Sequence, residues 1–194
     1  MNKTSLFSIV SVITFLILIN PCQGFSQDET NANYNDRGFY LGASLMGTSW
    51  NPGGNDEMDF GFGLAIKAGY NFTSNVGLFI SLDGSDMYPS DTESYVVTHF
   101  DLGIKGIFGS DAKRVRPFGR ASYIGMAAVD EGFEITGEGL GVGAGLNVYA
   151  SEKVSLEFSY NHSWITVTNG NQLGPVSEDH TNTGRLMIGA AYHF

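Results

Sequence analysis

Apolar and polar residues alternate with a period of two along most of the chain after residue 37. Within residues 59–72, every even-numbered position is apolar, whereas the odd-numbered positions hold glycine, alanine, asparagine and two charged residues. Successive side chains of a β-strand point to opposite faces, so this pattern predicts a strand whose two faces differ in chemistry. The same alternation predicts eight strands in all, over residues 38–50, 59–72, 76–85, 95–108, 117–128, 137–150, 154–164 and 184–194.

The connections between these segments alternate between short and long. The short ones are the tight turns 73–75 and 151–153 and the somewhat longer 109–116, and the long ones are 51–58, 86–94, 129–136 and 165–182. Strands of ten or more residues with short turns at one end and longer loops at the other are typical of a meandering barrel. The sequence therefore predicts an all-β fold, an eight-stranded antiparallel up-and-down β-barrel.

The position of the apolar face decides whether such a barrel is soluble or spans a membrane. The polar face holds mostly glycine, alanine and serine with scattered single charges. Glycine weakens a strand and covers no surface, so this face suits the narrow lumen of an eight-stranded barrel better than a solvated wall. The apolar face then points to lipid, which predicts a transmembrane β-barrel. The alternative is a β-sandwich with ordinary core aromatics.

Aromatic residues gather near both ends of the predicted strands, as two girdles at the membrane surfaces require. At the turn side they are Phe39, Tyr70, Phe72, Phe108, Tyr192 and Phe194. At the loop side they are Trp50, Phe60 and Trp164.

The first 26 residues have the composition of a secretory signal peptide. Their only charge is Lys3, and their mainly apolar stretch, 6–19, is shorter than the roughly 20 residues of a membrane-spanning helix. We therefore expect a cleavable signal peptide over residues 1–26, with cleavage after Gly24 or Ser26. A flexible polar leader over residues 27–36 and a barrel domain over residues 37–194 follow.

Three segments give the chain a family resemblance. The last strand ends LMIGAAYHF, with an apolar residue at every second position up to Phe194, and the segments GFYLGASLMG and RPFGRASYIG form the first and fifth predicted strands. In these features the chain resembles the small eight-stranded outer-membrane β-barrels of Gram-negative bacteria, which include the OmpA membrane domain, OmpX and the opacity-type proteins. The resemblance implies a bacterial outer-membrane location with both termini periplasmic. It also implies that the assembly machinery recognises Tyr192 and Phe194.

The charge of the chain is concentrated in the predicted loops. The sequence has 20 acidic and 10 basic residues, a net charge of −10. The long connections contain no Lys or Arg, and their acidic residues include Asp56, Glu57, Asp86, Asp91, Glu93, Asp130, Glu131 and Glu134. One interpretation is that these acids only keep the surface hydrated. The other is that they bind Ca²⁺ or Mg²⁺ that bridges to lipopolysaccharide, since hard cations prefer carboxylate oxygens.

Seven charged residues fall on the lumen side of the predicted strands: Lys67, Asp83, Asp101, Lys105, Arg120, Glu157 and Arg185. Counting from the turns places Lys67 level with Asp83 and Asp101, and places Lys105, Arg120 and Glu157 together at a lower level. The strand predicted over residues 117–128 has the least regular alternation. In it we place Phe118 and Ser122 inside with Arg120, and Ala121 and Tyr123 outside. An isolated buried ion costs several kcal/mol, so these charges must pair. We expect a salt-bridged plug rather than an open channel.

No residue pattern points to catalysis, a cofactor or nucleic-acid binding. Outer-membrane lipid A deacylases place a His and a Ser two residues apart on one strand, whereas His162 and Ser163 are adjacent and therefore point to opposite faces. We expect His99 to form hydrogen bonds in the lumen and His193 to lie on the turn-side surface. The single cysteine excludes a disulfide framework.

The sequence thus favours a non-enzymatic outer-membrane protein with no cofactor. Its expected role is structural or surface-interactive: adhesion, or the binding of partners or divalent cations through acidic loops. A small porin-like channel is the first alternative, and a lipid A-modifying hydrolase is the second.

Overall fold

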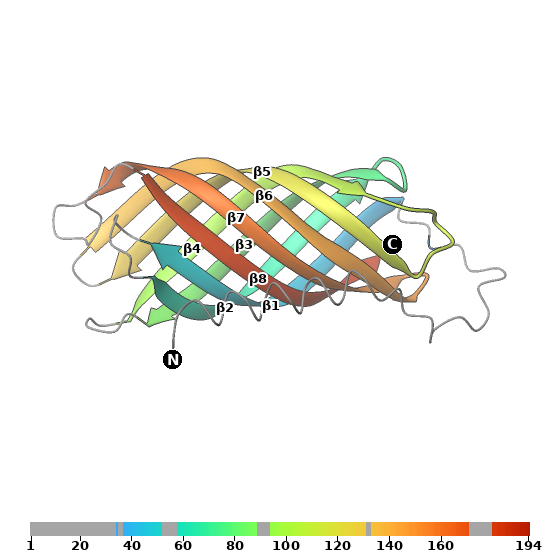
Figure 1. The fold of residues 1–194 in the computed structure, drawn as a ribbon, viewed down its shortest axis with the longest axis horizontal. Helices are drawn as coiled ribbons and strands as arrows, with labels where there is room; N and C mark the ends of the chain where they lie inside the picture. Colours follow the sequence, from blue (N-terminus) through green and yellow to red (C-terminus); the bar gives the residue numbers. More distant parts are fainter. Residues whose placement is uncertain (1–33, 35–36, 52–57, 89–93, 131–132, 171–179) are drawn as a thin grey trace, which may run out of the picture. The chain divides into compact units, whose positions relative to one another are not determined.

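The computed structural model describes residues 34, 37–51, 58–88, 94–130, 133–170 and 180–194. The chain divides into two units, 1–32 and 33–194, and all of the described residues belong to the second. These residues form a closed barrel in which each strand pairs antiparallel with its sequence neighbours and β8 pairs with β1 (Figure 1). The strands are β1 (Gly38–Asn51), β2 (Asp59–Asn71), β3 (Val76–Tyr88), β4 (Tyr95–Ile107), β5 (Val115–Asp130), β6 (Phe133–Ser151), β7 (Val154–Gly170) and β8 (His180–His193). The predicted fold is confirmed.

Within the described part of the chain, no helix is long and apolar enough to cross a membrane.

The pairing register shows how strongly the strands tilt. Directly paired residues can be followed from Leu41 on β1 through Ala68, Ile80, Leu102, Tyr123, Leu140, Trp164 and Asn182 back to Asn51 on β1. One circuit therefore climbs from residue 41 to residue 51 of the same strand, which is the stagger that closing a tilted sheet requires. Residues in one row consequently lie at different heights in the barrel.

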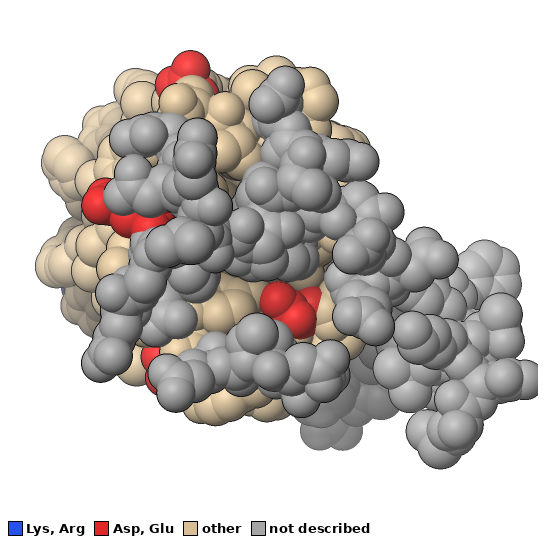
Figure 2. Space-filling model, turned by 90° about the vertical axis from the view of Figure 1, so that its left-hand side faces the viewer, with Lys and Arg blue, Asp and Glu red and all other residues tan. Residues whose placement is uncertain are grey.

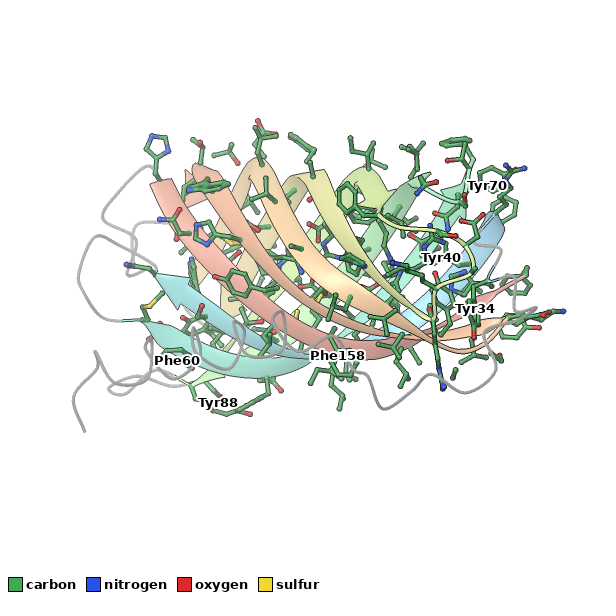
Figure 3. The ribbon with its side chains drawn as sticks, turned by 45° about the vertical axis from the view of Figure 1, so that its right-hand side comes forward. Tyr34, Tyr40, Phe60, Tyr70, Tyr88 and Phe158 are labelled. Carbon is green, nitrogen blue, oxygen red and sulfur yellow. The ribbon has the colours of Figure 1, made fainter. Side chains whose placement is uncertain are left out.

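The outer wall is apolar along most of its length. Phe62, Leu64 and Ile66 on β2 are 75%, 65% and 62% exposed, and the other strands carry similar outward residues. Figure 3 shows Phe60 and Tyr88 near the loop end of the wall and Tyr70 near the turn end. The turn-side aromatics predicted from sequence are all exposed: Phe39, Tyr70, Phe72, Phe108, Tyr192 and Phe194. Such a surface suits lipid rather than water.

Trp50 does not belong to the outer aromatic belt in which the sequence analysis placed it. Its side chain is fully buried, and its indole Nε1 donates a hydrogen bond to Thr181 Oγ1 over 2.6 Å. Trp50 shares the even-numbered face of β1 with Tyr40 and Met46, which are also buried. Because a strand has a strict period of two, residues on this face point into the lumen.

Strands β6 and β7 extend further toward the loops than their apolar alternation indicated. Near this end the pattern inverts: Ile135 and Ile165 are buried in the lumen, whereas Glu134 and Thr166 are exposed outside. A wall that has left the hydrocarbon region needs polar outward residues. The inverted pattern therefore continues the strands into residues that the sequence analysis assigned to loops.

Glycine makes room for large lumen side chains at particular places. A Cβ atom at Gly69 would collide with the ring of Tyr40, and one at Gly145 would collide with the ring of Phe118. Tyr40 and Phe118 are each 2% exposed. These glycines therefore allow aromatic rings to fill the lumen.

A basic residue on the apolar wall tests its contact with lipid. We predict that Ile66→Arg lowers the free energy of unfolding by about 2–4 kcal/mol, because residue 66 lies well inside the apolar band. Val96→Arg, one residue from the loop-side start of β4, costs about 0–1 kcal/mol because it lies near the membrane surface. Urea unfolding of the barrel refolded in phospholipid vesicles measures both values. Equal costs at the two positions would contradict a lipid-facing wall.

Candidate functional site: the packed lumen

An upper charge layer, nearer the loop end, joins three strands across the lumen. It consists of Asp83, His99, Asp101 and Arg185. Arg185 Nη1 donates to Asp83 Oδ2 over 2.5 Å and to Asp101 Oδ2 over 2.7 Å, and its Nη2 donates to Asp101 Oδ1 over 2.9 Å. His99 Nδ1 lies 2.8 Å from Asp83 Oδ1, which confirms the expected hydrogen-bonding role of this histidine. These four residues are at most 3% exposed, so the whole layer is buried.

A lower charge layer consists of Lys67, Lys105, Arg120 and Glu157. Glu157 accepts hydrogen bonds from Lys67 Nζ at 2.5 Å and from Lys105 Nζ at 2.9 Å, one on each carboxylate oxygen. Lys105 also donates to Asn147 Oδ1 at 3.3 Å. Arg120 Nε donates to Asn161 Oδ1. This layer thus connects β2, β4, β5 and β7.

The seven charged residues predicted for the lumen all point inward, but they group differently from the prediction. Lys67 pairs with Glu157 in the lower layer rather than lying level with Asp83 and Asp101. Counting residues from the turns ignores the climb of each paired row around the tilted barrel. The sequence analysis expected His99 in the lumen but did not single out Asn161, which occupies a lumen-facing position of β7.

An apolar cap of buried residues lies in the lumen above the two charge layers. It is formed by nine buried residues from the loop-side halves of the strands: Trp50, Met87, Tyr95, Val97, Ile124, Met126, Ala128, Ile135 and Ile165. The sequence analysis assigned small and polar residues to this face and missed the cap. The cap could have been found by continuing the alternation of its strands to their loop ends, where the lumen-facing positions hold apolar residues.

Aromatic rings and polar groups fill the turn-side end of the lumen. His193 is 7% exposed and its Nε2 lies 2.9 Å from Ser155 Oγ, so the prediction of a surface histidine is wrong. His193 points into the lumen because it alternates along the chain with the outward-facing Tyr192 and Phe194. Tyr34, the one described residue of the predicted leader, donates its backbone N–H to Asp111 O over 2.9 Å and stacks on Tyr149 at 5.2 Å between ring centroids.

The structure describes only some of the predicted cation-binding acids, and these lie at the opposite end of the barrel. Asp86 and Glu134 are exposed near the loop ends of β3 and β6, and Asp130 ends β5. Figure 2 views this end and shows acidic side chains on it. Among the residues that the structure describes, no group of three or more His, Cys, Asp or Glu is arranged to bind a metal ion. The remaining predicted acids lie outside the described residues: Asp56, Glu57, Asp91, Glu93 and Glu131.

His162 and Ser163 face opposite sides of the wall. Ser163 is fully buried in the lumen, whereas His162 packs edge-on against the outward Trp164 with ring centroids 4.7 Å apart. A nucleophile and its base must lie within hydrogen-bond reach. This pair therefore does not form a hydrolase dyad.

Comparison with known proteins agrees with this geometry. Residues 24–194 match the family model of the outer membrane protein beta-barrel domain. The chain belongs to this family. The resemblance noted in the sequence is thereby confirmed, and the protein is an outer-membrane β-barrel. No curated protein matches the chain.

Three solved structures illustrate the shared fold. Neisserial surface protein A is 19% identical with a TM-score of 0.63, and the match covers 80% of this chain and 97% of that one. OprG of Pseudomonas aeruginosa is 13% identical with a TM-score of 0.56 (84% and 99%). Ail, the attachment invasion locus protein of Yersinia pestis, is 17% identical with a TM-score of 0.53 (81% and 99%).

Arg185 is the residue whose loss most disturbs the upper charge layer. We predict that Arg185→Met destabilises the barrel by about 3–5 kcal/mol, because it leaves two buried carboxylates without their main counter-charge. Combining it with Asp83→Asn and Asp101→Asn recovers part of this loss, since the uncompensated charge is removed as well. Urea unfolding in vesicles compares the two variants. A triple variant less stable than the single one would contradict this account.

Proposed function

We propose that the protein is a non-conducting outer-membrane barrel that acts through its loop-side rim, in a structural role or in adhesion, partner binding or cation binding. The proposal is supported by the ion pairs of the two charge layers and by the buried apolar residues of the cap, all of which point into the lumen. Eight strands leave a lumen just wide enough for side chains. A solute pathway would have to displace all three layers.

The chemistry of the rim supports a surface role. Asp86, Glu134 and Glu138 are exposed near the loop ends of their strands, and Glu138 accepts a hydrogen bond from the outward Tyr123 hydroxyl. These three carboxylates give this end of the described barrel a negative character. Divalent cations held there would bridge the protein to the phosphate groups of lipopolysaccharide.

Two further features of the proposal concern delivery to the membrane. Residues 1–26 serve as a cleavable export signal, in keeping with their apolar stretch. Tyr192 and Phe194 serve as the signal for the assembly machinery. In support, both side chains are exposed on the outer wall, and Phe194 N–H pairs with Phe39 O beside the closing strands.

Conductance separates a plugged barrel from a small porin. We predict that the purified protein inserted into planar lipid bilayers gives no large, stable current steps, because the lumen is packed along its length. A double variant, Trp50→Gly with Arg185→Gly, shows increased current because it empties part of the cap and of the upper layer. Large stable steps from the unmodified protein would favour the porin-like alternative.

The role of the rim acids can be tested by calcium removal. We predict a higher melting midpoint in millimolar Ca²⁺ than in chelator for the protein in bilayers that contain lipopolysaccharide, because the cation neutralises clustered carboxylates. Asp86→Asn with Glu134→Gln reduces the difference, whereas Glu152→Gln in the turn between β6 and β7 leaves it unchanged. Identical melting curves with Ca²⁺ and with chelator would exclude the cation-bridging role.

A further inference from the structure

The lower charge layer contains more positive than negative charge. Lys67, Lys105 and Arg120 surround a single carboxylate, that of Glu157, and each of the four side chains is at most 10% exposed. Both oxygens of Glu157 are already used, because Oε1 accepts from Lys67 and Oε2 accepts from Lys105. Arg120 is therefore left to find another counter-charge.

Within the residues that the structure describes, no carboxylate forms an ion pair with Arg120. Its Nε donates to the amide oxygen of Asn161, and its Nη2 lies 3.5 Å from the Met187 sulfur, which is a weak acceptor. Arg120 is also directly opposite Lys105 in the β4–β5 register, on the same lumen face. Like charges directly opposite each other are destabilising. The guanidinium thus has a repulsive neighbour, and its two hydrogen-bond acceptors, an amide oxygen and a thioether sulfur, carry no negative charge.

Aromatic rings reduce this imbalance without removing it. Lys105 Nζ lies 4.0 Å from the centroid of the Phe118 ring, and the Arg120 guanidinium lies 5.4 Å from that of Phe79. A ring attracts a cation through its quadrupole, but it carries no net charge. The excess positive charge of the layer is unchanged by these contacts.

Taken together, the two layers carry one more positive charge than negative charge. Four cations, Lys67, Lys105, Arg120 and Arg185, face three carboxylates, Asp83, Asp101 and Glu157. A protonated His99 would add to the excess rather than reduce it. We propose that the lower charge layer binds a small monovalent anion, chloride, as the missing counter-ion of Arg120. One such anion makes the two layers neutral.

The surroundings of the layer define the side from which the anion enters. The apolar cap lies between the charge layers and the loop end. On the turn side the lumen contains buried polar residues among its aromatic rings, including Asn147, Ser155 and His193. Chloride therefore reaches Arg120 from the turn-side end of the barrel.

The test is the chloride dependence of stability. The barrel refolded in detergent micelles is unfolded with urea, because guanidinium chloride would itself supply the anion. Sodium gluconate is replaced stepwise by sodium chloride at constant ionic strength. The expected result is a midpoint that rises and saturates with chloride, the folding equilibrium shifting about tenfold when chloride reaches ten times its dissociation constant.

Two variants and one control locate the effect. Asn161→Asp places a carboxylate against Arg120 Nε, and Arg120→Gln removes the unpaired cation, so each is expected to abolish the chloride dependence. Asn161→Asp should also raise the midpoint in gluconate. Asn182→Asp makes the same chemical change on the exposed outer face of β8 and should keep the wild-type dependence.

Either of two results overturns the proposal. Superimposable wild-type curves in chloride and gluconate mean that the layer is neutralised without an anion, by loss of a lysine proton. A chloride dependence that persists in either of the two lumen variants means that the anion acts elsewhere on the protein. Neither result bears on conductance, which depends on the packing of the cap and the two layers rather than on a bound ion.

Discussion

The pairing of β8 with β1 is the interaction on which the rest of the structure depends. Tyr40 to Asn51 pair in sequence with His193 to Asn182, so the last strand and the first form one continuous ladder. In hydrocarbon an open strand edge would leave N–H and C=O groups without partners, at a cost of several kcal/mol for each group. Closure removes both edges. It also fixes the number of strands and the stagger between them, and these together set the width of the lumen.

The narrow lumen then decides which side chains meet. Arg185 on β8 reaches Asp83 on β3 and Asp101 on β4 because the lumen is narrow enough for side chains from opposite walls to meet. Lys67 and Lys105 meet on Glu157 for the same reason. Charges in such a space are shielded from water, so each charged group depends on its partners. The lumen therefore behaves as a polar and apolar core of the fold.

The proposed function therefore assigns different roles to the inside of the barrel and to its loop-side rim. The side chains inside the barrel form packing contacts, hydrogen bonds and ion pairs that stabilise the eight strands. The outer wall is occupied by lipid, to which Phe62, Leu64 and Ile66 present an apolar surface. We propose that partners bind at the loop-side rim, where the strands change to polar outward residues such as Glu134 and Thr166. This arrangement is why we assign the activity of the protein to that end.

The sequence by itself determined the eight strands, their order, their two faces and the lumen-facing positions of all seven predicted charges. Those features follow from the strict period of two within each strand, which can be recognised without knowing which other strands it pairs with. The same alternation also places Trp50 and His193 on the lumen face. The sequence analysis nevertheless assigned them to the surface, because aromatic and terminal residues are expected there. Only the tertiary structure decided that Lys67 pairs with Glu157, that Arg120 lacks a carboxylate partner among the described residues, and that buried apolar residues gather at the loop-side end of the lumen. Heights in a tilted barrel depend on the stagger accumulated over all eight strand pairs, and no single segment of the sequence carries that quantity.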